Sequence, residues 1–255
     1  MIIEKHNIEN PLISVVIPIY KEEKILESTL VRYTNDIRKK YNIELIVSDG
    51  GSKDKSVKIA EKYADKIFIH TEQRRQTIPE GRNKGAELAK GKVIVFINGD
   101  TYPENVDTFF DFITKWINDC SYCGKYPALA TRVFVPENDV RLSDKIFYNF
   151  FNHYVAFLNI IGIGMGRGEC QIVTKEIFEK VGGYNATLPA GEDFDLFRRI
   201  AKIAKTQYVS QITVIESPRR FRKIGYLKVL YNWTINGLSV MLSGKAKDKE
   251  WEAIR

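Results

Sequence analysis

The sequence predicts an α/β fold, a doubly wound and mostly parallel central sheet with helices on both faces. Apolar stretches alternate regularly with stretches of helical spacing through residue 100, the order that right-handed parallel crossovers produce. Residues 93–97 are five consecutive branched or aromatic residues, as expected of a strand buried on both faces. A chain of 255 residues can form one such unit with a substantial core.

The predicted elements are most regular in the first half of the chain. Strands are predicted at residues 12–18, 44–49, 66–70, 93–97 and 128–135, and helices at 24–40, 53–64, 81–89 and 107–117. Pro18 is expected to end the first strand, because proline has no donor for a sheet ladder. Beyond residue 105 the regular alternation of strand and helix fails.

The composition is that of an ordinary globular chain with a basic balance. A hydrophobic content of 44% and a charged content of 28% exclude disordered and fibrous classes. The formal charge of +7 favours anionic partners without choosing among them. Three cysteines and a first segment unlike a signal peptide predict a cytoplasmic location. The pair Cys120 and Cys123 lacks the further Cys or His that a zinc site needs.

A polar turn, Asn98-Gly99-Asp100, follows the strand at 93–97. Ligands of parallel sheets bind outside the carboxyl ends of the strands, and side chains two residues apart point to the same side. Two oxygen ligands placed in this way suit a divalent cation, Mg²⁺ or Mn²⁺, that also holds phosphates. The alternative is an ordinary turn, which these residue types also favour.

A second acidic group, Glu192-Asp193, stands at the start of a segment with helical spacing. Capping of the helix is the ordinary explanation, because free N–H groups and the helix dipole favour negative charge there. Two adjacent carboxylates after Gly191 are more than one cap needs. We expect such a carboxylate to be ionised at neutral pH and able to accept a proton from a substrate hydroxyl.

Two weakly charged, apolar runs occupy residues 146–166 and 224–242. Asparagines within both runs argue against a transmembrane span, although the first is long enough. Buried core helices are one interpretation. Helices lying at a membrane interface are the other, because cations and amphipathic aromatic residues flank or interrupt the runs. The flanking cations are Lys145, Arg167, Arg219, Arg220, Arg222 and Lys223.

Taken in order, these segments resemble the inverting nucleotide-sugar glycosyltransferases of family 2, which have the GT-A fold. The similarity spans about residues 12–223. Residues 14–22 resemble the opening strand and nucleotide loop, and residues 46–54 resemble the second loop, with Gly50 where many members have Asp. Residues 98–100 occupy the DxD position with Asn in place of the first Asp. The other matching segments are 81–85, 168–173, 178–184, 192–193 and 217–221.

The resemblance implies a role for each of these segments. Asp193 is the general base with Glu192 beside it, and the metal ligands are chiefly Asp100, with Asn98. The implied contacts to the nucleotide sugar are Pro18, Tyr20, Glu22, Asp49, Gly51, Arg82, Asn98, Gly99, Asp100, Arg219 and Arg220. The implied division is a GT-A domain at 1–223, with a donor half at about 12–105 and an acceptor half at about 106–223, and a C-terminal amphipathic helical extension at 224–255.

The predicted function is metal-dependent transfer of a sugar from a nucleotide-diphosphate sugar, with inversion. The acceptor is a glycan hydroxyl or a polyprenyl phosphate; the latter would explain the apolar runs through peripheral contact with the inner face of the cell membrane. A catalytically inactive nucleotide- or carbohydrate-binding GT-A protein is an alternative, because Asn98 replaces a carboxylate. A nucleotidyltransferase is disfavoured, because residues 18–23 lack a phosphate-binding glycine loop. No nucleic-acid partner is predicted, because no nucleic-acid motif gathers the basic residues.

Overall fold

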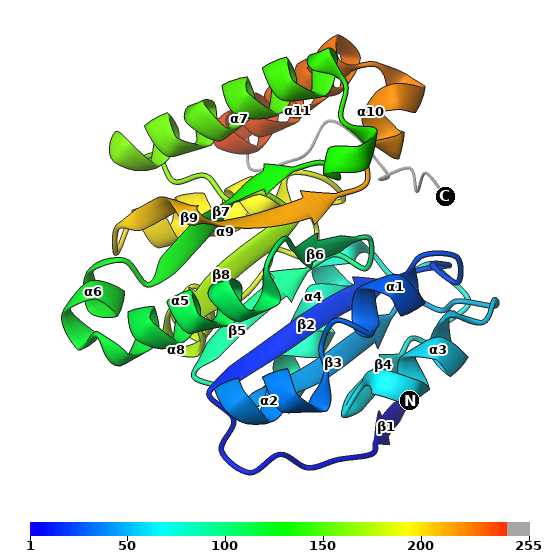
Figure 1. The fold of residues 1–255 in the computed structure, drawn as a ribbon. Coiled ribbons are helices and arrows are strands. Elements are labelled where there is room, and N and C mark those ends of the chain that lie inside the picture. Colours follow the sequence, from blue (N-terminus) through cyan, green and yellow to red (C-terminus); the bar gives the residue numbers. More distant parts are fainter. Residues whose placement is uncertain (244–255) are drawn as a thin grey trace.

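The computed structural model describes residues 1–243. Across these residues nine strands form one sheet in the order β1-β4-β3-β2-β5-β8-β7-β9-β6 (Figure 1). The strands are β1 (Ile2–Glu4), β2 (Ile13–Ile19), β3 (Ile43–Asp49), β4 (Lys66–Ile69), β5 (Val93–Ile97), β6 (Thr101–Pro103), β7 (Ala128–Phe134), β8 (Cys170–Thr174) and β9 (Thr206–Glu216). The helices are α1 (Leu26–Leu30), α2 (Asn35–Tyr41), α3 (Ser56–Tyr63), α4 (Ile78–Leu88), α5 (Val106–Asn118), α6 (Cys120–Lys125), α7 (Leu142–Ile160), α8 (Lys175–Lys180), α9 (Glu192–Ala201), α10 (Arg219–Ile224) and α11 (Tyr226–Ser243).

The predicted α/β class is confirmed, and the parallel part of the sheet lies where the sequence predicts it. Strands β4, β3, β2 and β5 are neighbours and run parallel, so their carboxyl ends share one edge. All five residues of β5 are buried. Figure 1 shows α2 and α5 in front of the sheet and α4 and α8 behind it, which explains the burial of β5 on both faces.

The second half of the sheet departs from the parallel pattern. Strand β8 lies between β5 and β7 and runs antiparallel to both, while β9 runs parallel to β7 and antiparallel to β6. The sequence does not predict β1, β6, β8 or β9 as strands. Strand β8 brings the segment that follows Gly168 next to β5, and therefore next to the turn at 98–100.

Three predicted elements have wrong boundaries: the helix at 24–40, the strand at 12–18 and the helix at 81–89. The helix predicted at 24–40 is two helices, α1 and α2, and the Thr34 side chain caps α2 by accepting a hydrogen bond from the Ile37 N–H at 3.3 Å. Strand β2 continues through Pro18 to Ile19. Its ladder with β5 ends at Val16, so this end of β2 has an open edge where proline is tolerated.

Helix α4 begins at Ile78, earlier than predicted, because Thr77 and Glu80 form a capping box. The helix packs closely on β2, since a Cβ atom placed on Gly85 would lie 2.3 Å from Val16 Cγ1. Only glycine therefore allows this approach without moving one of the two elements. The contact fixes α4, and with it Arg82, against the sheet.

A buried ionic cluster closes the opposite end of the parallel strands. The Glu44 carboxylate, which is fully buried, accepts hydrogen bonds from Ser14 Oγ at 2.5 Å and from Lys66 Nζ at 2.7 Å. The N–H groups of Lys90 and Gly91 donate to the same carboxylate. A buried charge with this many partners is stable, whereas removal of its cation would leave it uncompensated.

Helices α7 and α11 run side by side across the β7–β9 end of the molecule (Figure 1). One face of α7 belongs to the core, where Asn152 exchanges hydrogen bonds with the backbone N–H and C=O of Val133 at 3.1 and 2.9 Å. The opposite face exposes Ile146, Phe150, Phe157 and Ile160. The run at 146–166 thus combines a core helix with an exposed apolar face.

Within residues 1–243, no helix has the length and apolar character required to cross a bilayer. The predicted extension at 224–255 begins with α11, and its residues 244–255 lie outside the described residues. The division of the chain at residue 223 stays a prediction. In the structure Val229 and Val240 are buried, so α11 contributes to the packed interior.

Candidate active site

A cavity of about 440 Å³ lies at the carboxyl ends of the parallel strands. It collects residues that the sequence predicts for the site from five separate segments of the chain. They are Pro18, Tyr20, Glu22, Arg82, Asn98, Gly99, Asp100, Glu192, Asp193, Arg219 and Arg220. Asp49 and Gly51 lie outside the lining, although Ser48 and Gly50 of the same turn belong to it.

Asp49 orders the turn that follows β3, next to residues 20–22. Its Oδ2 accepts the N–H groups of Gly51 and Ser52, both at 2.9 Å, and Gly51 has a φ of +91°, a conformation that favours glycine. Ser52 Oγ in turn accepts the N–H of Lys21 at 2.8 Å. The buried Oδ1 of Asp49 has no hydrogen-bond partner among the described residues. Because Asp49 is fully buried and outside the cavity lining, it supports the turn from behind in this structure.

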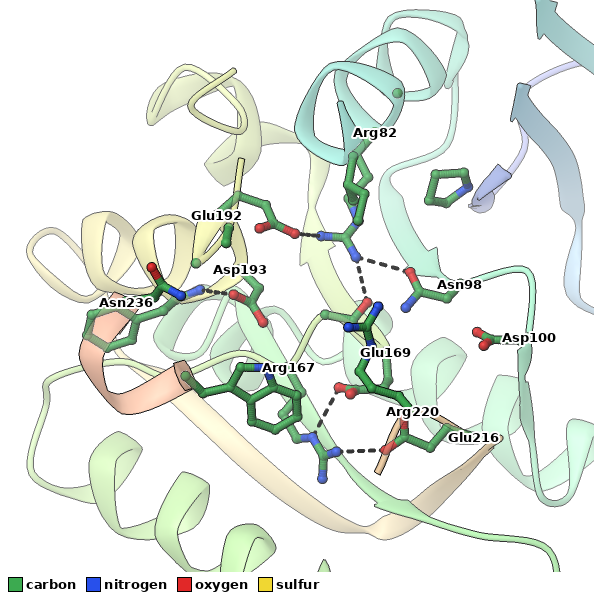
Figure 2. Close-up of a pocket in the computed structure, with 18 of the residues that line it drawn as sticks. Arg82, Asn98, Asp100, Arg167, Glu169, Glu192, Asp193, Glu216, Arg220 and Asn236 are labelled. Carbon is green, nitrogen blue, oxygen red and sulfur yellow. Dashed lines mark hydrogen bonds and ion pairs between the residues drawn. The ribbon is translucent and has the colours of Figure 1, made fainter. Parts of the chain in front are cut away.

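Arg82 joins the two halves of the cavity. Its side chain is 2% exposed, and Nη1 donates to Glu192 Oε1 at 2.8 Å. Nη2 donates to Asn98 Oδ1 at 3.1 Å and to the carbonyl of Gly168 at 2.6 Å (Figure 2). A single guanidinium from α4 thus holds the turn after β5, the segment before β8 and the start of α9.

Asp100 points to the other end of the cavity, where α10 begins. Arg219 Nη2 donates to Asp100 Oδ2 at 3.0 Å and to Glu22 Oε2 at 3.3 Å. Asn98 and Asp100 therefore contact different arginines, although they flank the same glycine. The side chain of Asp100 is 24% exposed, so its carboxylate is accessible from the cavity.

These residues fit a divalent cation. Mg²⁺ is commonly held by one or two carboxylates together with substrate phosphates and water. Asp100 supplies an accessible carboxylate, and Glu22 supplies a second one on the same arginine. The oxygen of Asn98 is engaged by Arg82, which makes Asp100 the principal candidate ligand.

Asp193 is the base that the sequence predicts, at the first turn of α9. Burial raises its pKa to about 7, and the negative charge of Glu192 acts in the same direction. Its Oδ1 accepts the N–H of Phe194 at 2.8 Å. The expectation of a fully ionised group at neutral pH needs correction, because at this pKa the protonated and ionised forms have similar populations. Burial outweighs the helix N-terminus, which favours the ionised form.

A second ionic cluster at the cavity wall has no counterpart among the predicted site residues. Arg167, with a side chain 1% exposed, donates from Nε to Glu169 at 3.1 Å and from Nη2 to Glu216 at 3.0 Å (Figure 2). Burial raises the pKa of Glu216 well above its ordinary value. Burial also acts to raise the pKa of Glu169, but the charge and hydrogen bond of Arg167 outweigh it and the pKa is lowered. Because neither β8 nor β9 is predicted as a strand, no pattern in the sequence marks these three charged residues as a buried cluster.

Residues 14–182 match the family profile described as Glycosyl transferase family 2. The chain belongs to this family. "Uncharacterized glycosyltransferase RP339" of Rickettsia prowazekii (strain Madrid E) is 24% identical over 219 residues, covering 82% of this chain and 65% of that protein. "Glycosyltransferase AglE" of Haloferax volcanii is 32% identical over 96 residues, or 36% of this chain and 32% of that protein. The chain spans just under two thirds of the length of RP339, the longer of these two matches.

Solved structures of other transferases share the fold. The mannosyltransferase PcManGT from Pyrobaculum calidifontis, in complex with GDP-Man and Mn²⁺, superposes with a TM-score of 0.67 at 18% identity, covering 93% of this chain and 66% of that one. S. aureus TarS 1–349, in complex with UDP-GlcNAc, gives 0.57 at 16% identity, with 81% and 59% covered. These likenesses confirm the predicted GT-A fold of this family 2 chain.

Proposed function

We propose that this family 2 protein transfers a sugar from a nucleotide-diphosphate sugar to an acceptor, with inversion at the anomeric carbon and with the help of a divalent cation. One observation carries the proposal. A single cavity has Asp100 at one end and Asp193, whose pKa is raised, at the other (Figure 2), and Arg219 donates a hydrogen bond to Asp100. The pair of Asp100 and Arg219 suits a leaving diphosphate, and Asp193 suits an attacking hydroxyl.

The donor is assigned to the end of the cavity at the parallel strands. Arg219 and Arg220 neutralise the diphosphate as negative charge develops on it. Asp100, with Asn98 next to it, would hold Mg²⁺ or Mn²⁺, and such an ion supplies further neutralisation of the leaving group when it is bound. The nucleoside contacts are assigned to Pro18, Tyr20, Glu22 and Gly99, which line the cavity, with Asp49 and Gly51 ordering the turn behind them.

Asp193 takes the proton of the acceptor hydroxyl in a single displacement. The acceptor oxygen forms the new bond to the anomeric carbon while the bond from that carbon to the diphosphate oxygen breaks, and the electron pair leaves with the diphosphate. Attack opposite to the leaving group inverts the anomeric centre. Glu192 is bound to Arg82, so it holds that arginine in place, and its negative charge raises the pKa of Asp193. Asp193 is the residue that accepts the proton. A polyprenyl phosphate acceptor, being already ionised, would need Asp193 for orientation only.

The exposed face of α7 is assigned to peripheral contact with a membrane. Ile146, Phe150 and Phe157 project from this face, and the cations Lys145 and Lys228 lie on α7 and its neighbour α11. Apolar side chains combined with cations favour an anionic bilayer surface. Flotation with anionic vesicles at low salt should carry the wild-type protein upward and leave F150S/F157S behind. Equal flotation of both proteins would contradict the assignment.

Thermal unfolding with UDP, GDP, CDP and dTDP, each with and without Mn²⁺, tests the donor site. A ligand that binds only the folded protein raises its stability by RT ln(1 + [L]/Kd). We expect a shift with one nucleotide that grows with Mn²⁺ and is lost in D100N. A complete lack of response to all four nucleotides would contradict the nucleotide-sugar proposal.

Transfer with the sugar donor identified in this way tests the base. D193N should reduce transfer by about 10²- to 10⁴-fold, the usual contribution of a positioned base. D195N is the matched control, because Asp195 lies on the same helix but pairs with Arg199 at 2.8 Å, outside the cavity. Equal activity of D193N and the wild type would remove Asp193 from the mechanism.

A further inference from the structure

The cavity has a second region, beyond Asp193, with a different chemistry. It extends between α7 and α11 and is lined mainly by apolar and aromatic side chains. They are Phe151, Tyr154, Leu158, Ile163, Met165, Phe194 and Trp233. The Trp233 ring lies 5.2 Å from Phe151 and 5.6 Å from Phe221, which anchors α11 against α7 and α10. We call this region the apolar wall.

The two buried arginines between the apolar wall and the donor end, Arg82 and Arg167, are each held by carboxylates. Arg82 is bound to Glu192, and Arg167 is bound to both Glu169 and Glu216. The Arg167 guanidinium also lies over aromatic rings of α7, 5.0 Å from that of Phe151. Two further arginines of the cavity lining, Arg219 and Arg220, are assigned to the donor diphosphate. A phosphate monoester bound beside Asp193 would therefore need a cation that Arg82 and Arg167 supply only by giving up a partner.

A neutral hydroxyl group, unlike a phosphate, needs no cation at this place. A Cβ atom on Gly168 would lie 3.3 Å from Asp193 Oδ2 and 3.5 Å from Arg82 Nη2, so a larger residue would crowd the carboxylate, whereas glycine keeps it open to the cavity that both residues line. A carboxylate accepts a hydrogen bond from a hydroxyl, while an apolar group attached to that hydroxyl gains by leaving water for the apolar wall. In this arrangement the hydroxyl of the acceptor faces Asp193 and the donor, and the apolar part of the acceptor lies against the apolar wall.

We propose that the acceptor is a neutral amphiphile, in which a hydroxyl-bearing head lies at Asp193 and an apolar body lies along the wall formed by α7 and α11. The inference rests on the proposed transferase function and decides between its two acceptor classes in favour of the hydroxyl. It also gives α11 a role in the site, because Trp233, Asn236 and Gly237 line the cavity from that helix. Figure 2 places Asn236 on the same side of the cavity as Asp193.

Four probes separate the contributions of head and body. Octyl β-D-glucoside and octyl phosphate share a chain and differ in the head, while methyl β-D-glucoside has the head without the chain. Glucose 1-phosphate, a charged sugar, completes the set. Binding is measured by calorimetry at about pH 8, with the octyl compounds kept monomeric and the protein saturated with its nucleotide. We expect octyl glucoside to bind at least about tenfold more tightly than each of the other three.

Two variants locate the binding. Y154A and W233A should each weaken octyl glucoside binding by about tenfold, as expected when an aromatic contact is lost. Tyr154 is 41% exposed, so Y154A is the variant least able to disturb the fold, and thermal unfolding checks both. L142A is the matched control, because Leu142 is 74% exposed on the same helix, lies outside the cavity and has no assigned role.

Octyl phosphate binding as tightly as octyl glucoside would overturn the hydroxyl assignment. Methyl glucoside binding as tightly as octyl glucoside, or equal weakening by L142A and Y154A, would overturn the apolar wall as the acceptor site. Failure of octyl glucoside to bind would overturn both. The nucleotide-dependent thermal shift is independent of these results, so a protein that keeps this shift while failing with octyl glucoside contradicts the acceptor inference alone.

Discussion

Replacement of Asp193 by Asn should change the pH dependence of both stability and transfer, because burial and Glu192 raise the pKa of this carboxyl from 3.8 to about 7. In stability, a carboxyl with a raised pKa favours the folded state only while it is protonated. Its contribution is fully present below about pH 4 and is lost as the pH rises through about 7. D193N should therefore be more stable than the wild type at about pH 8 and gain nothing at about pH 4.

The magnitude follows from the shift. A change of about three pKa units corresponds to at most about 4 kcal/mol in favour of D193N at about pH 8. Urea unfolding at the two pH values measures this difference without knowledge of either substrate. Asp195 is ion-paired with Arg199 on the same helix, so D195N should not show the gain at high pH. A D193N protein that is no more stable than the wild type at about pH 8 would refute the raised pKa.

The rate of transfer should depend on the same ionisation of Asp193, but for transfer the ionised form is the favourable one. Only the ionised carboxylate accepts a proton, so activity should rise with pH and reach about half of its plateau near pH 7, falling about tenfold for each unit below. E192Q removes the charge that helps to raise the pKa of Asp193 and frees Arg82 to lower it, so the midpoint should move to lower pH. A midpoint that moves upward, or a curve that keeps this limb in D193N, would contradict Asp193 as the base.

Three further predictions test the fold and the donor end. G85A should destabilise the protein by about 1–3 kcal/mol in urea unfolding, because the new methyl group forces α4 away from β2, whereas G124A, with nothing within 4 Å, should not. K66M should cost about 3–5 kcal/mol, because it leaves the buried Glu44 without its cation, and a loss below about 1 kcal/mol would contradict that account. D100N should retain the fold but lose any Mn²⁺-dependent part of the nucleotide thermal shift, and a shift equal to that of the wild type would remove Asp100 as the metal ligand.

The parallel half of the fold was predictable because its signals are local. Strands β2, β3 and β5 are short apolar runs between turn residues, and their parallel direction follows from the alternation with helices. Strand β8 has no such signal of its own. It is a strand because β5 and β7 supply hydrogen-bond partners on both sides, and those partners lie far away in the sequence.

The same distinction applies to the cavity. Asp100 and Asp193 are recognisable because they stand in short motifs, whereas Arg167, Glu169 and Glu216 are not. Glu216 is 49 residues from Arg167 in the chain, and their ion pair depends on β9 lying beside β7, one strand away from β8. A charged residue beside a strand is ordinarily a solvated one, so only the folded structure shows that these three charges are buried together.

The pKa of Asp193 shows why a sequence motif can locate a carboxyl group without predicting its protonation state. At the first turn of a helix, free N–H groups lower the pKa of a carboxyl, and the sequence therefore predicts an ionised carboxylate at neutral pH. In the structure Gly191 and Phe194 place the group at the cavity wall, Glu192 adds a like charge, and burial determines the direction of the shift. The cavity that contains this carboxyl group is lined in part by α7 and α11, which the motifs do not contain. The raised pKa that the proposed base requires is therefore a property of the folded cavity and not of the motif alone.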